Sequence, residues 1–229
     1  MNMKRDKGII VAIDGPAGVG KSTVGRAVAA RLGYRFISTG KMYRALAWKA
    51  IAAGAGLDDE KALLGLASSA KWELKPSDTS EPLLCLDGIP LDREITDENV
   101  AKASSAVSKF AGVRAFMRDM QRGMGAEGGV VMEGRDICTN VFPDAEVKIY
   151  LDASPEARAG RRARQLAALG LEADRAAILA FILERDEQDS RRKNNPLKRA
   201  EGGNYIDSTG LDREQVVEEI FRLCAQAMV

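Results

Sequence analysis

The amino-acid sequence predicts an α/β domain of three layers, in which a mostly parallel sheet is flanked by helices. Three observations support this class. Short apolar segments alternate with segments of helical periodicity along the chain. The first apolar segment, residues 8–14, leads through a glycine-rich turn into a helical pattern over 21–32. Since 229 residues suffice for one substantial core, we expect a single domain with a small antiparallel insertion and a helical lid.

The glycine-rich turn matches the phosphate-binding pattern G-x-x-x-x-G-K-[ST] at every fixed position. Side chains at its glycines would obstruct the backbone N–H groups that wrap a polyphosphate. Lys21 supplies a charge to the β and γ phosphates, and the Ser22 hydroxyl can bind Mg²⁺. A turn that merely joins a strand to a helix is the alternative. We therefore predict a P-loop NTPase fold with Ser22 as the metal ligand. The predicted ATP-binding residues are Gly15, Pro16, Ala17, Gly18, Val19, Gly20, Lys21, Ser22 and Thr23.

The alternation of strands and helices continues after the turn. The next predicted elements are a strand over 34–37, a turn over 38–40 into a helix that carries apolar residues from Met42 to Ala50, and a helix over 58–68. Asp58 is the expected N-cap of the last of these helices. Over residues 71–93 the pattern changes to short apolar runs with breaks, and Asp87-Gly88 signals a tight turn. This stretch predicts the antiparallel insertion, which either contacts a substrate or forms a surface flap without chemistry.

The second half of the chain returns to the α/β pattern. The predicted elements are helices over 96–110 and 112–123, strands over 130–132 and 147–152, a helix from 154, a long helix over about 173–193, a strand over 204–207 and a helix over 212–228. The strand over 130–132 delivers Glu133-Gly134-Arg135-Asp136 at its carboxyl end, the edge of an α/β sheet at which ligands bind. Asp212 and Gln215 resemble a capping box at the start of the last helix.

The composition excludes several classes of function. The 34 basic and 33 acidic residues leave a net charge of +1, which gives no support to a nucleic-acid partner. With no histidine in the sequence, a histidine base and a histidine-ligated metal are excluded. Three widely spaced cysteines predict neither disulfides nor a zinc site, and favour a reducing compartment. Because no apolar run suits a secretory signal or a membrane span, we expect a cytoplasmic protein without membrane contact.

Charged residues share a stripe on the predicted long helix. Ile178, Ile182, Arg185, Asp189 and Arg192 follow one another at steps of four and three residues. An apolar face that becomes charged without changing direction aims those charges at a cleft. The alternative is an ordinary solvated run of charges, and the spacing alone leaves both interpretations open.

Further arginines are expected near this cleft, and they point to a second anion. Arg44 follows a strand, Arg135 lies at a strand end, and guanidinium groups bind phosphate oxygens in pairs. This favours γ-phosphoryl transfer to a nucleoside monophosphate. Arg158, Arg161 and Arg162 form a basic flap that would close over the donor phosphates, unless they are simply a solvated face. Lys21, Arg158 and Arg162 are the predicted catalytic residues. A phosphate acceptor is already anionic near neutral pH, so no general base is required.

The sequence resembles the bacterial cytidylate kinase family. The matching segments are residues 13–22, Ser38-Thr39-Gly40-Lys41-Met42-Tyr43-Arg44, Gly134-Arg135-Asp136, residues 141–145, residues 148–154, Glu184-Arg185-Asp186 and Ile206-Asp207-Ser208-Thr209. They run in order through essentially the whole chain. The resemblance implies ATP-dependent phosphorylation of CMP and dCMP, with Mg²⁺, by a monomer in pyrimidine nucleotide metabolism.

The resemblance also assigns parts of the chain. It places Ser105, Arg114 and Asp136 at the cytosine ring, Arg185 and Asp189 at the sugar, and Thr39, Arg44, Arg135 and Arg192 at the acceptor phosphate. It implies a core of about 1–38, 129–153 and 194–229, a monophosphate-binding part of about 39–128 with its insertion at about 70–95, and a lid of about 154–193. The chain departs from the family at Ser38, where aspartate is common, at Lys41, where a small residue is usual, and at Cys138, where glycine is usual.

Two alternatives to this function stay open at the level of sequence. One is a kinase of the same fold for another small acceptor, such as UMP, AMP or shikimate, which would not need Asp136 to read an amine. The other is a nucleotide-dependent switch protein. Its support is limited to the D-x-x-G match of residues 207–210, because no N-K-x-D motif is present.

Overall fold

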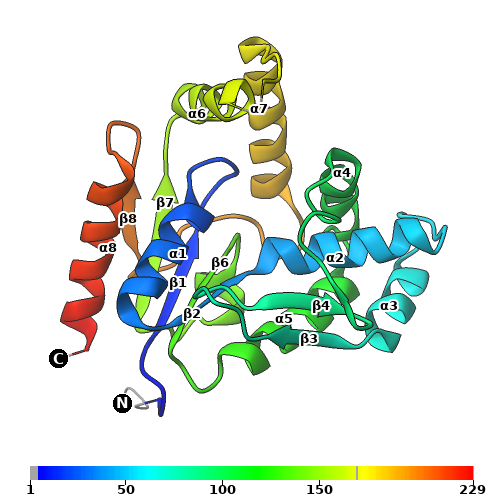
Figure 1. The fold of residues 1–229 in the computed structure, drawn as a ribbon, viewed down its shortest axis with the longest axis horizontal. Helices are drawn as coiled ribbons and strands as arrows, with labels where there is room; N and C mark the ends of the chain where they lie inside the picture. The colour runs from blue at the N-terminus through cyan, green and yellow to red at the C-terminus, as the bar shows by residue number, and fades with distance from the viewer. Residues whose placement is uncertain (1–4, 169, 229) are drawn as a thin grey trace.

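A five-stranded parallel sheet forms the centre of the molecule (Figure 1). The computed structural model describes residues 5–168 and 170–228, so residues 1–4, 169 and 229 of the predicted core and lid segments lie outside the described part. The strands are β1 (Ile10–Asp14), β2 (Arg35–Ser38), β6 (Val130–Gly134), β7 (Val147–Asp152) and β8 (Asn204–Asp207), in the order β2-β6-β1-β7-β8. Neighbouring strands pair in parallel, which confirms the predicted fold class.

Helices cover both faces of this sheet. Because successive side chains of a strand point to opposite faces, Val11 and Ile13 of β1 face one way, and Ile10 and Ala12 face the other. The first face is covered by α1 (Lys21–Leu32) and α8 (Arg213–Ala227). The second face packs on a single π-helical turn, η1 (Ile137–Val141), and on the residues that follow it. The strand that leads into the glycine-rich turn is therefore buried on both sides, as expected of a central parallel strand.

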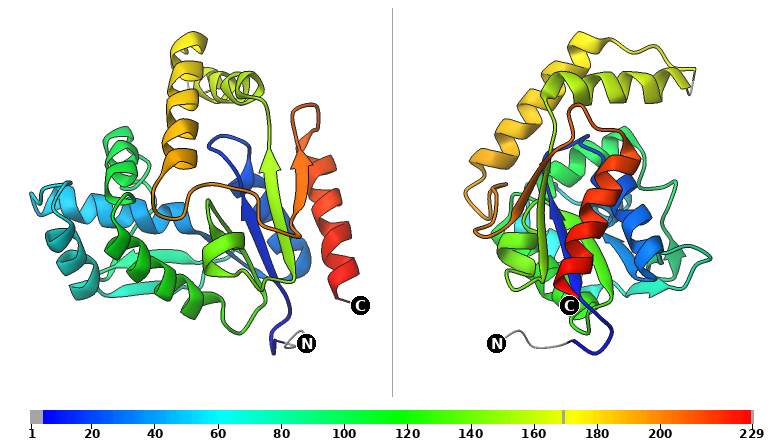
Figure 2. Two further views of the ribbon diagram at one scale, coloured as in Figure 1. Left: turned by 180° about the vertical axis from the view of Figure 1, so that it is seen from behind. Right: turned by 90° about the vertical axis from the view of Figure 1, so that its left-hand side faces the viewer.

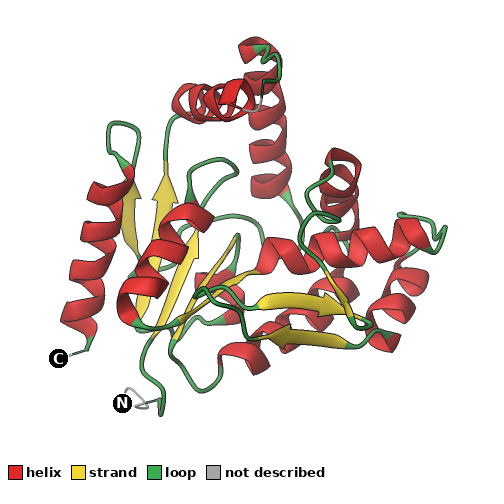
Figure 3. Cartoon of the chain, viewed as in Figure 1, coloured by secondary structure: helices red, strands yellow, loops and turns green. Residues whose placement is uncertain are grey.

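A second hydrophobic core lies beside the sheet. It is formed by the helices α2 (Thr39–Ala52), α3 (Glu60–Ser69), α4 (Glu98–Val107) and α5 (Ala111–Gly125) and by the strands β3 (Trp72–Lys75) and β4 (Leu83–Leu86). A third, exposed strand, β5 (Ile89–Pro90), pairs with β4. These three strands form a separate antiparallel sheet, which confirms the predicted insertion (Figure 3). Asp87 and Gly88, with φ angles of 53° and 82°, make the predicted tight turn between β4 and β5.

Two helices stand away from the sheet. They are α6 (Pro155–Ala168) and α7 (Arg175–Arg191), and Figures 1 and 2 show both above the end of the sheet at which β1 meets the glycine-rich turn. The Ser154 hydroxyl accepts a hydrogen bond from the Ala157 amide at 3.2 Å, as expected for a cap of α6. The α6–α7 pair therefore overhangs the site that the sequence predicts.

One expected cap is wrong by one residue. The carboxylate of Asp59, rather than that of Asp58, accepts the Ala62 amide at 3.0 Å and begins α3. The two aspartates are equivalent by pattern, and the packing of Leu63 and Ala67 into the second core selects the register. In α8 the predicted capping box is confirmed, because Asp212 accepts the Gln215 amide and the Gln215 side chain accepts the Asp212 amide.

The three cysteines are buried in different parts of the structure. Cys224 on α8 and Cys138 on η1 pack against opposite faces of the parallel sheet, and Cys85 lies on β4. All three are free thiols. Among the described residues, no helix combines the length and the apolar character needed to cross a bilayer.

Candidate active site

The glycine-rich turn connects β1 to α1 at the carboxyl edge of the sheet. Gly15, Gly18 and Gly20 have φ angles of 153°, 78° and 100°, and a Cβ at Gly15 would lie 2.0 Å from the Leu151 carbonyl oxygen. The glycines are thus required by backbone conformation and, at Gly15, by close packing. Gly20 is the N-cap of α1, so the unpaired N–H groups of that helix face the turn.

Lys21 lies inside the turn and is almost fully buried. Its ammonium group donates to the carbonyl oxygens of Gly15 and Pro16, both at 2.8 Å. Burial, together with the positive charge of Arg135, lowers the pKa of Lys21 to about 7. A polyanion bound in the turn would raise the pKa of Lys21 again, because a nearby negative charge favours the charged ammonium group. Because its charge affects Lys21, Arg135 lies close to the phosphate turn.

Asp14, the last residue of β1, ties the phosphate turn to the loop that carries Asp136. Its two carboxylate oxygens accept the backbone amides of Ile137 and Cys138, each at 2.8 Å. Burial raises the pKa of Asp14 to about 6, although these two amides act in the opposite direction. Cys138 has the negative φ that most residues favour, since outside glycine the positive φ angles of the described residues belong to Asp87 and Asn195. The family's usual glycine is therefore not required here.

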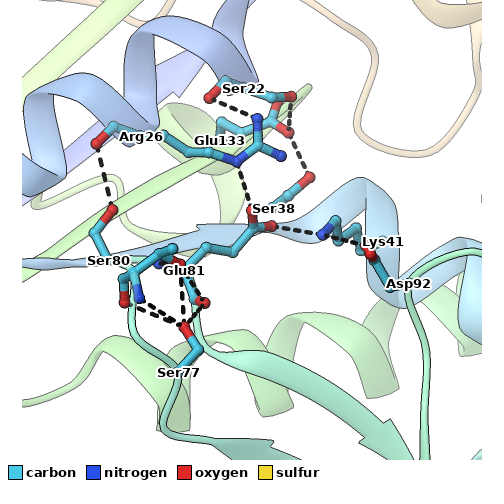
Figure 4. Close-up of polar contacts among 10 residues, drawn as sticks. Ser22, Arg26, Ser38, Lys41, Ser77, Ser80, Glu81, Asp92 and Glu133 are labelled. Atoms are coloured by element: carbon cyan, nitrogen blue, oxygen red, sulfur yellow. Dashed lines mark hydrogen bonds and ion pairs between the residues drawn. The ribbon is translucent and has the colours of Figure 1, made fainter.

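Ser22 meets a buried carboxylate that the sequence analysis did not include among the site residues. One oxygen of Glu133 accepts the Ser22 hydroxyl at 3.0 Å and the Ser38 hydroxyl at 2.5 Å (Figure 4). Glu133 ends β6, which pairs directly with β1. The available signal was an acidic residue at the end of a buried strand. Ser38, in the position where the family has aspartate, serves here as a donor to Glu133.

The residues predicted at the acceptor phosphate gather at the same edge. Arg135 donates to the Asp189 carboxylate at 2.8 Å, and Arg192 lies 3.6 Å from the other oxygen of that carboxylate. The Thr39 hydroxyl donates to the Glu133 carbonyl at 2.9 Å. Burial lowers the pKa of Arg44, and the nearby charges of Arg162 and Arg135 lower it further. Arg44, Arg135 and Arg192 therefore lie near one another at this edge of the sheet.

Arg185 joins this cluster from α7. Burial, together with the positive charges of Arg135 and Arg44, lowers the pKa of Arg185 to about 10. Arg185 and Asp189 lie one turn apart on α7, and Arg192 is the C-cap of that helix. The charged half of the predicted stripe thus faces the site, which favours the cleft interpretation over a solvated run.

The residues predicted at the base are arranged around one ion pair. Arg114 lies 2.6 Å from the Asp136 carboxylate, and their side chains are 4% and 9% exposed. The Asn140 amide donates to the same carboxylate oxygen at 3.0 Å. The Arg114 guanidinium also lies 5.7 Å from the centre of the Tyr43 ring. Ser105 is half-buried on α4, one turn before Ser108, whose carbonyl accepts Arg114 at 3.4 Å.

Of the basic flap on α6, two arginines contact the phosphate turn. Arg158 donates to the Ala17 carbonyl at 3.1 Å and to both oxygens of Asp186 on α7 at 3.0 and 2.5 Å. Arg161 donates to the Val19 carbonyl at 3.2 Å. Arg158 thus donates hydrogen bonds to the phosphate turn and to α7. Arg162 is exposed instead and lies near Arg44.

A cavity of about 510 Å³ opens beside the turn, and none of its lining residues belongs to the arginine cluster. Its walls come from the phosphate turn, from α6 and from the segment that leads into α8, and they include Gly18, Val19, Thr23, Arg161, Ser208 and Leu211. This volume lies in the range of small-ligand pockets. The sequence did not reveal this cavity, because its walls are distant in the chain.

Two regions suited to anions, the phosphate-binding turn and the arginine cluster, therefore share one edge of the sheet. A fold and site of this kind define a P-loop phosphotransferase. Comparison with known proteins narrows the class, since the sequence profile described as Cytidylate kinase matches residues 11–226. This chain belongs to the cytidylate kinase family, as the resemblance in its motifs predicted.

Individual relatives agree over nearly the full length. A cytidylate kinase of Geobacter sp. (strain M21) is 45% identical over 218 residues, covering 95% of this chain and 93% of the relative. A cytidylate kinase of Geobacillus kaustophilus is 46% identical over 215 residues, covering 94% and 96%. A solved structure of an uncharacterized protein from Eubacterium ventriosum shares the fold, with a TM-score of 0.54, 12% identity and coverage of 96% and 99%.

Proposed function

We propose that this protein transfers the γ-phosphoryl group of ATP to CMP and dCMP. The observation that carries the proposal is the buried Arg114–Asp136 pair, which lies next to the arginine cluster and is joined through Asp14 to the phosphate turn. An ionised carboxylate accepts hydrogen bonds but cannot donate them. Asp136 therefore suits the exocyclic amine of cytosine and disfavours the carbonyl oxygen that uracil has at that place.

Donor and acceptor would occupy the two anion regions. The phosphate turn and Lys21 would hold the ATP phosphates, and the cavity beside Thr23 and Arg161 would take the adenosine. Arg44, Arg135 and Arg192 would hold the acceptor phosphate, with Arg185 and Asp189 at the sugar. The acceptor oxygen is already anionic, so positioning and neutralisation of charge suffice for catalysis. Arg158 and Arg162 are proposed to neutralise the transferring group when the lid, residues 154–193, closes over ATP.

Mg²⁺ is the cofactor that we infer to accompany ATP. The Ser22 hydroxyl and the Glu133 carboxylate are oxygen ligands 3.0 Å apart at the phosphate turn, and Mg²⁺ prefers such ligands. These residues fit the ion and would hold it directly or through water. When bound, it would neutralise charge on the β and γ phosphate oxygens. We also propose a monomer, since one chain supplies every group named above.

The acceptor can be identified by measuring ADP release with CMP, dCMP, UMP, AMP and shikimate in turn. We expect the highest kcat/KM with CMP and dCMP, because Asp136 would distinguish these bases from uracil. A higher value with AMP or shikimate would contradict the proposed function, and equal values with CMP and UMP would contradict the role of Asp136.

The role of Lys21 is tested by Lys21→Met. Its charge-assisted contact with the transferring group is made in the transition state, so we expect kcat to fall by roughly 10² to 10³. The matched control is Lys61→Met on the exposed face of α3, which should leave turnover unchanged. Normal turnover in the Lys21 variant would remove this lysine from the mechanism.

A further inference from the structure

The loop between β3 and β4, residues 76–82, is attached to the parallel sheet and not only to its own antiparallel sheet. β2 is an edge strand, and its Phe36 amide donates to the Ser80 carbonyl at 2.7 Å. The Ser80 hydroxyl donates to the Arg26 carbonyl on α1 at 3.4 Å. This loop, which we call the docking loop, therefore covers part of the free edge of β2 and contacts α1.

Glu81 of the docking loop connects two helices through its two carboxylate oxygens. One oxygen accepts Arg26 of α1 at 2.5 Å, and the other lies 2.9 Å from the ammonium group of Lys41 on α2 (Figure 4). The Glu81 side chain is 14% exposed. Burial alone would raise the pKa of Glu81, but the hydrogen bond from Arg26 and the positive charge of Lys41 hold it below its ordinary value. One carboxylate oxygen is thus hydrogen-bonded to α1, and the other forms an ion pair with α2.

Both helices begin with residues of the proposed active site. α1 begins with Lys21 and Ser22 at the donor phosphates, and α2 begins with Thr39 and carries Arg44 at the acceptor phosphate. Lys41 lies in the first turn of α2, where a positive charge is unfavourable beside the positive end of the helix dipole. The negative charge of Glu81 offsets this effect.

We propose that Glu81 is a positioning residue, which holds the amino end of α2 against α1 and so places the acceptor phosphate relative to ATP. This inference rests on the proposed function. Lys41 stands where the family usually has a small residue, so the Glu81–Lys41 contact is a feature of this chain. Glu81 acts through Lys41 and the docking loop, and it does not touch the substrates itself.

The test is the Glu81→Gln variant, assayed with CMP and with ATP as the varied substrate. We expect the KM for CMP to rise about fivefold and the KM for ATP to change less than about twofold, because coupling residues of this kind typically modulate binding by such factors. Glu73→Gln is the matched control. It removes an ion pair with Lys71 from the same antiparallel sheet without contacting α1 or α2, and it should change neither KM.

A second variant reaches the same contact from α2. Lys41→Ala should also raise the KM for CMP, and in Glu81→Gln/Lys41→Ala the combined effect should be smaller than the product of the single effects. Independent multiplication of the two effects, equal changes in both KM values or an unchanged KM for CMP would overturn the inference. Turnover of CMP by the unmodified protein tests the proposed function separately in the same assay.

Discussion

Arg114 and Asp136 show what sequence reasoning misses at the scale of single residues. Each was assigned to the base by resemblance. Their ion pair joins the helix α5, which carries Arg114, to the loop after β6, which carries Asp136. Local patterns do not encode such a contact. Glu133 and Asp14 were missed as site residues for the same reason, since a carboxylate at a strand end acquires a role only through partners elsewhere in the chain. The phosphate turn was predictable because its residues are contiguous.

Base selectivity is the prediction that belongs to this scale. Asp136→Asn keeps the shape of the side chain but offers a donor as well as an acceptor, so the amide can pair with uracil. We expect the ratio of kcat/KM for CMP to that for UMP to fall by about tenfold or more. Asp119→Asn, at an exposed position on α5, should leave the ratio unaltered. A constant ratio in the Asp136 variant would mean that other groups read the base.

At the scale of elements, α7 was predicted too long at both ends. The predicted helix covers 173–193, whereas α7 runs from Arg175 to Arg191. Asp174 caps its start by accepting two amides. At its end the Arg192 side chain donates to the carbonyls of Asn194 and Asn195, which follow it in the chain, and Asn195 has a φ of 51°. Helical periodicity continues through these residues, so the spacing alone could not reveal either boundary.

The capping box of α8 gives a prediction at this scale. Asp212→Ala leaves an amide of the first turn without its side-chain acceptor, so we expect the free energy of unfolding to fall by about 1 kcal/mol. Asp212→Asn retains an acceptor and should lose less. Urea denaturation measures both, with an unchanged m-value showing that unfolding exposes the same surface. Equal stability of the alanine variant and the unmodified protein would show that the cap is dispensable.

At the scale of the whole molecule, the alternation of strands and helices predicted a parallel sheet but not the order of its strands. β6 lies between β1 and β2, although α2, α3, α4 and α5 separate β2 from β6 in the chain. Strand order depends on which apolar faces meet in the folded protein, and the residues of a single strand do not specify it. The cavity beside the phosphate turn was hidden for the same reason.

The pH dependence of stability tests the buried link between the two halves of the site. The pKa of Asp14 is raised from 3.8 to about 6 by burial. Between these values the unfolded chain is ionised while the folded protein keeps the proton, so the stabilisation from Asp14 is complete below pH 4 and is lost as pH rises through 6. Asp14→Asn does not titrate. Its stability relative to the unmodified protein should therefore increase by roughly 2 to 3 kcal/mol from pH 4 to pH 7.

Denaturant unfolding of both proteins across this range measures the difference. A difference that stays constant with pH would show that Asp14 is ionised throughout. A difference that changes in the opposite direction would show that the amides of Ile137 and Cys138 outweigh the effect of burial.

The burial of all three cysteines makes the chain suitable for site-specific labelling. Since Cys85, Cys138 and Cys224 are enclosed, the folded protein offers a maleimide reagent no accessible thiol among its own cysteines. A single cysteine introduced at Phe181, which is exposed on α7, would carry a fluorophore without removal of any native cysteine. The fluorophore would then report whether α7 moves during turnover in the otherwise unaltered enzyme.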